Sequence, residues 1–455
     1  MNLQKIFNAF LLFAGALVIA SCSKDCDLDY ADQLQGLPTL RAGSFPEKDL
    51  TINLGEQYEY APQVSSPSDV YYQWYLNGED MSTDPSFSYK ADRPTRSKLV
   101  LELTNDLGKV KLENNITVPG ADFSKGCLVI NEGWFGHETG SIAYYNYEKN
   151  SIEHWAYKGQ NYGATLGTTS QSATLWKGKL YVCSKDKNHL VVMDPKTLYM
   201  EKSSGTLTRY QAYEFIGLNE DYGIITHNGY FTRVDLKTFK TVTLMSVGNT
   251  WAGTGSGIVY NGKLLLNVKG NKIHAIDLEA LLLPDVKPTD KIASTQLDIY
   301  TSGGTRFVEG KDGNLYTVET TKTGVNNLVK IKPDFTFEKA TMRADYTPSN
   351  FGAYREASFC GTPDGVFYYT ANAKIYKATF ADAAPDKALT DYRKDGYGFY
   401  SAGIRVNPAT NELIAIYLTG DYDKNLLVRF NANTGAKLSE ITYDGYYFPS
   451  TVIFN

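Results

Sequence analysis

The sequence has few cysteines, few histidines and no cluster of basic residues. Five of its 455 residues are cysteine, five are histidine, and the formal net charge is −5. Without a basic cluster to neutralise phosphates, we expect no nucleic acid among its partners. The cysteine spacing shows no disulfide framework. Cys127, Cys183 and Cys360 lie in apolar runs typical of buried strands, so we expect free, buried thiols there.

Catalytic signatures are also missing. The chain contains no His-Glu-x-x-His motif, no nucleophile elbow and no phosphate-cradling glycine loop. We therefore expect a protein that is not an enzyme and that uses no cofactor. A carboxylate pair drawn from Glu132, Glu356 and Asp421 would suit a glycosidase if two of them lay at working distance. A surface polysaccharide hydrolase or lyase is therefore kept as an alternative.

The apolar stretch Phe7–Ile19 follows Lys5 and is too short for a stable membrane span, which predicts a secretory signal over residues 1–21. The end of this stretch, Ile19-Ala20-Ser21-Cys22, matches the bacterial lipobox, so Cys22 is the expected site of lipidation. The alternative is an ordinary signal with an incidental cysteine. Residues 22–36 form an acidic tether that resembles the export signal of Bacteroidetes lipoproteins. It predicts a lipid anchor in the outer membrane, facing the extracellular side.

Residues 37–119 form a separate module in this interpretation. Tyr71–Gly78 alternates as a sandwich strand does and runs into a turn, and Ser97–Gly108 with Lys109–Val118 reads as a hairpin. The pattern resembles immunoglobulin-like and PKD-like modules of bacterial surface proteins, with Trp74 as the core tryptophan. Its expected role is to space the rest of the chain from the membrane.

A repeated segment organises residues 120–455. An aromatic or glycine-rich approach leads through small residues into a short apolar run, about seven times at a spacing of roughly 40–50 residues, as in four-stranded propeller blades. The copies are Gln171–Trp176, Tyr210–Phe215, Gly255–Tyr260, Gly303–Val308, Ala353–Phe359, Tyr400–Val406 and Tyr446–Asn455. In each repeat, a second strand follows this opening strand, and a third strand ends in a turn. In that turn an Asp or Asn side chain can hydrogen-bond the backbone two residues further along the chain.

The first propeller repeat, from Cys127 to Asn146, has second and third strands but no opening strand of its own. The C-terminal segment would supply that strand and leave no exposed edge. The expected fold class is therefore all-β, with an N-terminal Ig/PKD-like β-sandwich followed by a seven-bladed β-propeller closed by the C-terminal strand.

Aromatic residues crowd the loops at one face of the expected propeller. Exposed apolar side chains in loops indicate binding more often than those in strands do. The expected ligand-binding residues are Trp134, Phe135, His137, Arg209, Tyr210, Trp251, Arg306, Phe351, Tyr354, Arg355, Phe399, Tyr400, Tyr446 and Tyr447. His137, His189 and His227 fall in corresponding hairpins, but the distance between blades favours polar turn residues over a metal site, so no metal is expected.

The stretch Gly126–Gly136 and the following Gly140–Asn146 resemble the opening of the YncE-like, seven-bladed surface lipoproteins of gut Bacteroidetes. That group includes cobalamin-capturing propellers that sit on TonB-dependent transporters. The family's Gln-Ser opener is present as Gln171-Ser172, whereas its Pro-Arg step is Thr208-Arg209. The resemblance implies the fold and the location; the divergent loops imply a different cargo.

The expected function is therefore capture of a nutrient, a small molecule such as a corrinoid, a glycan or a peptide, and its transfer to an outer-membrane TonB-dependent transporter. A protein-docking scaffold is a further alternative, because propeller faces also bind protein partners.

Overall fold

The chain, described here from a computed structural model, divides into two compact units, Met1–Ala121 and Asp122–Asn455. The structure describes residues 36–161, 163–207, 211–227, 230–246, 254–268, 272–287, 291–301, 306–346 and 358–455. The expected signal, Cys22 and almost all of the tether lie outside these residues. Within the described ranges, no helix combines the length and the apolar character that crossing a membrane requires.

The first unit is built from strands only, in the part of it that the structure describes. They are β1 (Thr39–Leu40), β2 (Leu50–Thr51), β3 (Gln57–Tyr60), β4 (Val64–Ser65), β5 (Tyr71–Leu76), β6 (Glu79–Ser82), β7 (Phe87–Lys90), β8 (Thr95–Asn105) and β9 (Gly108–Val118). A five-stranded sheet has the order β2-β9-β8-β5-β6, and β3 pairs with β7, as β1 does with β4. The turn from β5 to β6 has positive φ at Asn77 and Gly78, which fits a two-residue hairpin.

Trp74 lies at the centre of the core of the first unit, as its sequence predicted. Its side chain is fully buried, and its ring stacks on Phe87 with centroids 5.5 Å apart. The indole N–H donates to the Asp84 carbonyl oxygen at 2.9 Å, so the buried polar atom is satisfied. The predicted hairpin is also present, as β8 paired with β9 from Thr95↔Val118 to Asn105↔Gly108.

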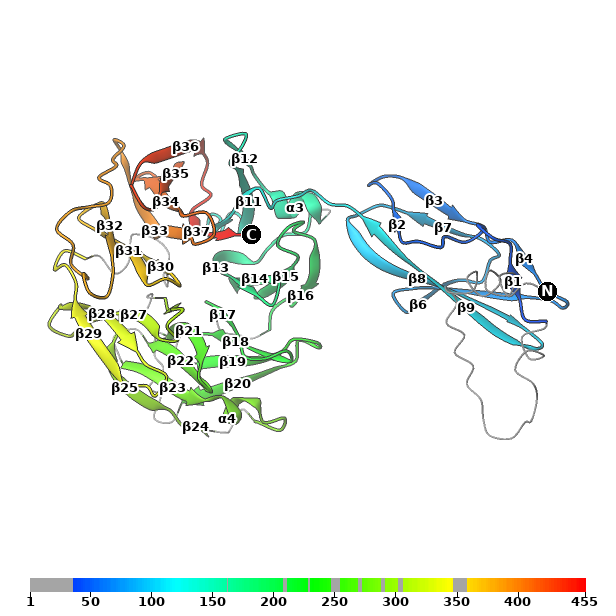
Figure 1. Cartoon of the computed structure of the whole chain (residues 1–455), viewed down its shortest axis with the longest axis horizontal. Coiled ribbons are helices and arrows are strands. Elements are labelled where there is room, and N and C mark those ends of the chain that lie inside the picture. The colour runs from blue at the N-terminus through cyan, green and yellow to red at the C-terminus, as the bar shows by residue number, and fades with distance from the viewer. Residues whose placement is uncertain are drawn as a thin grey trace, which may run out of the picture. The chain divides into compact units, whose positions relative to one another are not determined.

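The second unit contains seven sheets in its described part, numbered here along the chain (Figure 1). Sheet 1 holds β10 (Gly126–Asn131), β11 (Ser141–Asn146), β12 (Ser151–Glu153) and β37 (Pro449–Phe454); sheet 2 holds β13 (Thr168–Trp176), β14 (Lys179–Asp186), β15 (Leu190–Met193) and β16 (Met200–Ser203); sheet 3 holds β17 (Phe215–Gly217), β18 (Tyr222–Thr226), β19 (Tyr230–Asp235), β20 (Thr241–Ser246) and β24 (Lys291–Ile292).

Of the remaining sheets in the described part, sheets 4, 5 and 7 have four strands and sheet 6 has three. Sheet 4 holds β21 (Thr254–Tyr260), β22 (Lys263–Val268), β23 (Lys272–Asp277) and β25 (Thr295–Tyr300); sheet 5 holds β26 (Val308–Glu309), β27 (Leu315–Thr320), β28 (Asn326–Ile331) and β29 (Phe337–Thr341); sheet 6 holds β30 (Phe359–Thr362), β31 (Val366–Ala371) and β32 (Lys374–Ala378); sheet 7 holds β33 (Tyr397–Asn407), β34 (Glu412–Thr419), β35 (Lys424–Asn431) and β36 (Lys437–Asp444). Two short helices, α3 (Ala156–Gln160) and α4 (Leu278–Leu282), lie between strands.

Figure 1 shows the seven sheets arranged around a common centre. Each sheet shares a buried apolar cluster with the next one along the chain. Another such cluster joins sheet 7 to sheet 1 and contains Ile414 and Ile416 beside Cys127, Val129 and Val452. The cores of the first and last sheets are therefore in direct contact.

The C-terminal strand β37 belongs to sheet 1, where it pairs antiparallel with β10. The register runs from Cys127↔Phe454 to Asn131↔Pro449. The Ser450 hydroxyl donates to the carbonyl oxygens of Ile130 and Ser170, at 3.1 and 3.3 Å. The end of the chain is thus bonded both to its own sheet and to sheet 2.

The polar turns after the third strands have the predicted local geometry. The Asp194 carboxylate accepts hydrogen bonds from the backbone N–H groups of Lys196 and Thr197, both at 2.9 Å. Asp235 and Asn431 bond the two corresponding N–H groups in their own turns. Asp277 differs, because helix α4 begins directly after it and its side chain makes no capping bond.

The three cysteines of the second unit are free and buried, as predicted. Removal from water disfavours the thiolate, so burial raises the pKa of the Cys127 and Cys360 thiols to about 12. They act as small apolar side chains in the sheet cores.

Candidate functional site

The structure describes eight of the fourteen expected ligand-binding residues. Six lie outside the described residues: Arg209, Tyr210, Trp251, Phe351, Tyr354 and Arg355. The other eight come from the connection between β10 and β11, the connection between β36 and β37, strand β33 and the segment before β26. They separate into an exposed group and a packed group.

The exposed group centres on a tight turn after β10. The Trp134 carbonyl oxygen accepts the backbone N–H of His137 at 2.8 Å, and Gly136 has φ +82°. A type II turn needs positive φ at its third residue, which glycine adopts without a steric penalty. Phe135 therefore occupies the tip of the turn, and its side chain is 70% exposed.

The C-terminal connection holds this turn in place. The backbone N–H groups of Glu132 and Gly133 donate to the carbonyl oxygens of Phe448 and Tyr447, at 2.9 and 3.1 Å. Gly133 has φ +75°, and a Cβ atom there would lie 2.2 Å from the Thr139 carbonyl oxygen. A side chain at position 133 would therefore collide with the other end of the same β10–β11 connection.

These bonds bring the Trp134 ring into a stack. Its centroid lies 3.9 Å from that of His137 and 4.4 Å from that of Tyr446, with interplanar angles of 25° and 26°. Trp134 and Tyr446 are still 39% and 40% exposed. We call Trp134, Phe135, His137 and Tyr446 the aromatic cluster. It unites two segments that are more than 300 residues apart in sequence.

Three predicted residues lie elsewhere than in exposed loops. Phe399 and Tyr400 belong to strand β33, so their expected placement in a loop is wrong. The Phe399 ring stacks on Tyr417 with centroids 4.6 Å apart, and Tyr400 is buried. Tyr447 does lie in the β36–β37 connection, but its half-buried ring stacks on His154 at 4.4 Å.

Arg306, the last of the eight described residues, lies just before β26 and is half-buried. Its carbonyl oxygen accepts the Thr317 hydroxyl at 3.2 Å. It comes from sheet 5, whereas the aromatic cluster is built on the connections that flank β10 and β37 of sheet 1.

A buried carboxylate lies close to the aromatic cluster in sequence. Glu132 lies two residues before the turn, and its two oxygens accept hydrogen bonds from Gln171 Nε2 at 2.9 Å and from the Tyr400 hydroxyl at 3.2 Å. These partners come from sheets 2 and 7, so the network joins three sheets. Burial raises the pKa of Glu132 above its ordinary value, against the smaller effect of its hydrogen bonds. The sequence marked Glu132 only as one of several carboxylates.

Two of the three histidines lie in the connections between strands where the sequence predicted them. His189 lies between β14 and β15, His227 directly follows β18, and both are buried. His227 lies within hydrogen-bond distance of the Gln211 carbonyl oxygen at 2.8 Å and of the Thr232 hydroxyl at 2.9 Å. Burial lowers the pKa of His227 to about 4, so its ring is neutral at pH 7. No group of three or more potential metal ligands occurs among the described residues.

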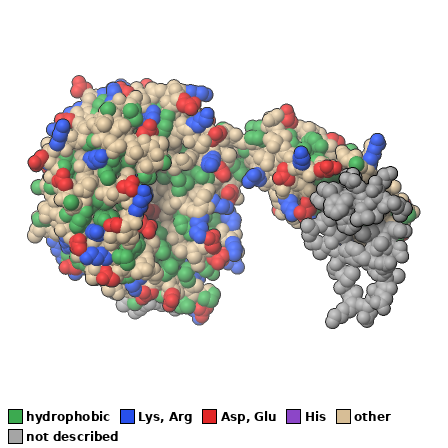
Figure 2. All heavy atoms as spheres, viewed as in Figure 1, with side chains coloured by type: hydrophobic (Ala, Val, Ile, Leu, Met, Phe, Trp, Pro, Cys, Tyr) green, Lys and Arg blue, Asp and Glu red, His purple; other side chains and the backbone are tan. Residues whose placement is uncertain are grey.

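The charged surface carries no single-sign patch on the face of the second unit drawn in Figure 2. Basic and acidic side chains are interspersed there, with apolar side chains between them.

Together, the two units combine a PKD-like domain with a β-propeller-like domain. The PKD-like model matches residues 43–105, and the model of a domain of unknown function, DUF5074, matches residues 125–455. The chain belongs to the DUF5074 family. No curated protein sequence matches it.

Solved structures give further similarities. A quinonprotein alcohol dehydrogenase-like protein from Bacteroides thetaiotaomicron is 28% identical, with a TM-score of 0.62 over 92% of this chain and 99% of that one. The extracellular domain of a putative one-component system from B. thetaiotaomicron is 9% identical, with a TM-score of 0.42 over 93% of this chain and 68% of that one. The Cps50 (Swd1) β-propeller domain of Myceliophteria thermophila is 12% identical, with a TM-score of 0.42 over 72% and 98%.

Proposed function

We propose that this protein is a non-catalytic lipoprotein of the cell surface that captures a ligand with its aromatic cluster. The observation that carries the proposal is the exposed, stacked group of Trp134, His137 and Tyr446 with Phe135 at its tip. Rigid aromatic side chains provide large contact area at low entropic cost. Two backbone hydrogen bonds to the C-terminal connection order them before any ligand arrives.

The scaffold in this proposal is a seven-bladed propeller closed by the C-terminal strand, related to the YncE-like proteins. Seven sheets around a common centre support it, as does the packing of sheet 7 against sheet 1. The pairing of β37 with β10 supports closure by the C-terminus. Closure in this way would leave the binding turn dependent on the last residues of the chain.

The location proposed is the outer membrane, with a lipid on Cys22 and the protein facing outward. The lipobox Ile19–Cys22 and the acidic residues after it motivate this proposal. Acylation requires the thiol, so Cys22→Ala should release the protein from the membrane fraction or leave an unprocessed precursor. Normal processing with unchanged membrane association would refute the lipid anchor.

The cargo proposed is a nutrient, either a corrinoid, a glycan or a peptide, which is then handed to a TonB-dependent transporter. An amphipathic ligand with a flat apolar face suits contact with Phe135 and the exposed parts of the Trp134 and Tyr446 rings. The divergent loops noted in the sequence motivate a cargo different from that of the cobalamin-capturing relatives.

The decisive experiment is calorimetric titration of the full chain with corrinoids, glycans and peptides, followed by Phe135→Ala. Phe135 is the sharpest probe, because among the described residues its ring has no aromatic partner and truncation should not disturb the fold. A ring that anchors the ligand should cost about 2 kcal/mol or more on truncation, a loss of at least roughly thirtyfold in affinity.

The matched control is Leu283→Ala, which truncates another apolar side chain, 54% exposed, after α4. It should leave both the affinity and the melting temperature unchanged. Equal affinities of the wild type and the Phe135 variant for the best ligand would refute the aromatic cluster as the site. If the protein cleaved a bound glycan into shorter products, hydrolysis would replace capture as its proposed function.

A further inference from the structure

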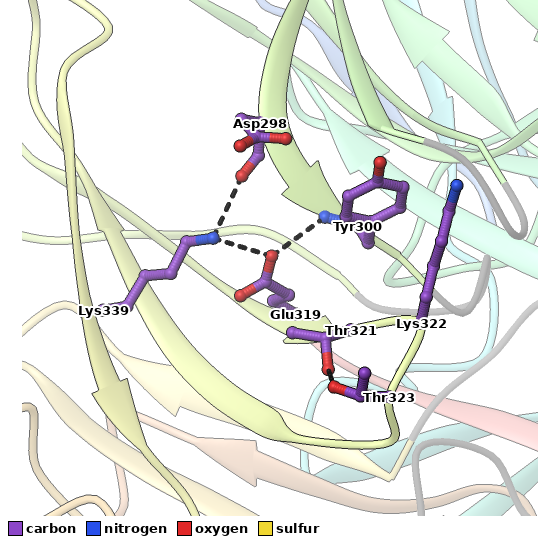
Figure 3. Close-up of a pocket in the computed structure, with 7 residues that line it drawn as sticks. All are labelled: Asp298, Tyr300, Glu319, Thr321, Lys322, Thr323 and Lys339. Atoms are coloured by element: carbon purple, nitrogen blue, oxygen red, sulfur yellow. Dashed lines mark hydrogen bonds and ion pairs between the residues drawn. The ribbon is translucent and has the colours of Figure 1, made fainter.

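A pocket of about 310 Å³ lies between sheet 4 and sheet 5, separate from the aromatic cluster (Figure 3). Its volume is at the lower end of the range that small-molecule sites occupy. Its walls come from the ends of β25 and β27, the β27–β28 turn and β29. The lining residues are Asp298, Tyr300, Glu319, Thr321, Lys322, Thr323 and Lys339.

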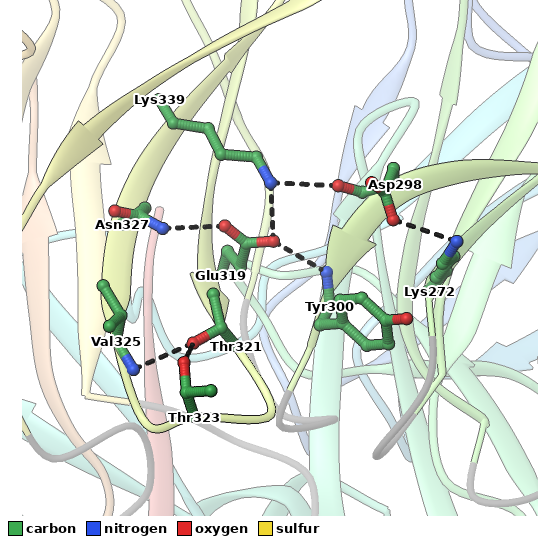
Figure 4. Close-up of polar contacts among 9 residues, drawn as sticks. All are labelled: Lys272, Asp298, Tyr300, Glu319, Thr321, Thr323, Val325, Asn327 and Lys339. Atoms are coloured by element: carbon green, nitrogen blue, oxygen red, sulfur yellow. Dashed lines mark hydrogen bonds and ion pairs between the residues drawn. The ribbon is translucent and has the colours of Figure 1, made fainter.

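An ion pair between a buried carboxylate and a partly exposed lysine forms one wall of the pocket (Figure 4). The Glu319 side chain is 1% exposed and accepts Lys339 Nζ at 2.8 Å, Asn327 Nδ2 at 2.8 Å and the Tyr300 backbone N–H at 3.2 Å. Lys339 also donates to the Asp298 carbonyl oxygen at 3.0 Å. The two charges cancel, and their hydrogen bonds fix β25, β27, β28 and β29 relative to one another.

The remaining charges leave one cation in excess. The Asp298 carboxylate pairs with Lys272 at 2.9 Å. Lys322 has no carboxylate partner among the residues that the structure describes. Asp298 and Glu319 are thus each paired with a lysine, Lys272 and Lys339, which leaves Lys322 as the lining ammonium group without a paired carboxylate in the described part of the chain.

The position of Lys322 is set by a well-bonded turn. The Gly324 N–H donates to the Thr321 carbonyl oxygen at 3.0 Å, and Gly324 has φ +83°. The Thr321 hydroxyl accepts the Val325 N–H at 2.9 Å and lies 3.0 Å from the Thr323 hydroxyl. The Lys322 ammonium lies 5.1 Å from the centroid of the Tyr300 ring, within the range of a cation–π contact.

We propose that this pocket binds the carboxylate-bearing ring of an acidic sugar. Lys322 would pair with the carboxylate, and the hydroxyls of Thr321 and Thr323 would hydrogen-bond the sugar hydroxyls. The Tyr300 ring would contact the apolar C–H groups of the sugar. The Lys322 ammonium group favours an anion, because the other lining charges are paired. The Tyr300 ring, the two hydroxyl groups and the volume of the pocket favour a sugar over a bare inorganic ion.

This site is independent of the proposed capture at the aromatic cluster. The cluster is built on sheet 1, whereas the pocket belongs to sheets 4 and 5, on another part of the ring of sheets in Figure 1. Either site can fail without the other, and variants at one leave the other unchanged.

The test is titration of the full chain with digalacturonic acid, with galactobiose as the neutral counterpart and with inorganic sulfate as the bare anion. We expect the wild type to bind digalacturonic acid at millimolar concentration or below, and more weakly as salt increases. Lys322→Gln should lower this affinity about tenfold, and Lys322→Arg should retain most of it. Tyr300→Leu should also weaken binding, by removing the ring.

The matched control is Lys149→Gln, which removes an exposed lysine of the β11–β12 turn that has no carboxylate partner among the described residues. It should change the affinity less than twofold. Because Lys322 is exposed in a turn, its variants should melt within a degree or two of the wild type. No binding of digalacturonic acid by the wild type, or equal loss in the two lysine variants, would overturn the proposal. Equal or tighter binding of sulfate would also overturn it, by reducing the pocket to an anion site.

Discussion

The contribution of strand β37 can be tested with a single substitution, Val452→Ala. Val452 is 2% exposed and lies opposite Val129 in the pairing of β37 with β10. It belongs to the apolar cluster that joins sheet 7 to sheet 1. Shortening this side chain should therefore weaken the contact between the two ends of the second unit.

The expected loss follows from the buried methyl groups. Removal of two methyl groups costs about 1.6 kcal/mol at about 0.8 kcal/mol each. The cavity left behind raises the loss in the free energy of unfolding to about 2–3 kcal/mol. Deletion of Tyr447–Asn455 should cost more, because it also removes the pairing with β10 and the two Ser450 hydrogen bonds. That loss is comparable to the total stability of many domains, about 5–15 kcal/mol.

Urea unfolding monitored by tryptophan fluorescence suits this measurement. Four of the five tryptophans, all except Trp74, lie in the second unit, so the signal reports mainly on it. The urea midpoint should fall in Val452→Ala while the slope of the transition stays constant. The control is Leu438→Ala, since Leu438 lies in β36 and is 47% exposed. It should change the free energy of unfolding by less than about 0.5 kcal/mol.

Equal midpoints for the Val452 and Leu438 variants would refute the reasoning, because the buried contact would then contribute nothing. A truncated chain that unfolds at the wild-type midpoint would also show that β37 does not stabilise the second unit.

Two further predictions concern the buried carboxylates. Glu319→Gln should lower the free energy of unfolding by about 2–3 kcal/mol, because it leaves Lys339 without its counter-ion and places an amide N–H₂ group against hydrogen-bond donors. The loss is smaller than the roughly 3–5 kcal/mol for a fully buried pair, because Lys339 is partly exposed. An unchanged urea midpoint would contradict this prediction. Burial raises the pKa of Glu132, so the contribution of this group to stability is fully present below its unfolded pKa of about 4.3 and is lost as pH rises through the folded pKa. The Glu132→Gln variant does not undergo this loss, so its stability relative to the wild type should rise over that pH window. A stability difference that is independent of pH from 4 to 8 would count against this prediction.

Local features of the fold could be predicted from the sequence because they depend on neighbouring residues. The Asp194 turn bonds its own backbone, and the strand–turn pattern around Trp74 places a large apolar side chain on the inner face of a sheet. The pairing of the two ends was also readable, because the unit that begins at Cys127 lacks an opening strand and the chain ends with one. In each case the signal is carried by a continuous segment.

The candidate site depended on which sheets come together. Trp134 and Tyr446 were both predicted as ligand residues, but nothing in their local sequence shows that their rings stack. Phe399 and Tyr400 are aromatic, as the residues of a recognition loop often are, yet they belong to strand β33, and the Tyr400 hydroxyl bonds the buried Glu132. Whether an aromatic residue is exposed depends on which other segments pack against it.

The pocket beside Lys322 illustrates the same limit. Its charges come from Asp298, Glu319 and Lys339, on three different strands, and none belongs to a recognisable motif. Their pairing leaves Lys322 as the excess cation, a balance that exists only once β25 lies beside β27. The sequence alone therefore determined local features such as the strand around Trp74 and the Asp194 turn, because those follow from local patterns of polarity. The tertiary structure decided which side chains meet, since contact and burial depend on the register and packing of strands distant in the chain.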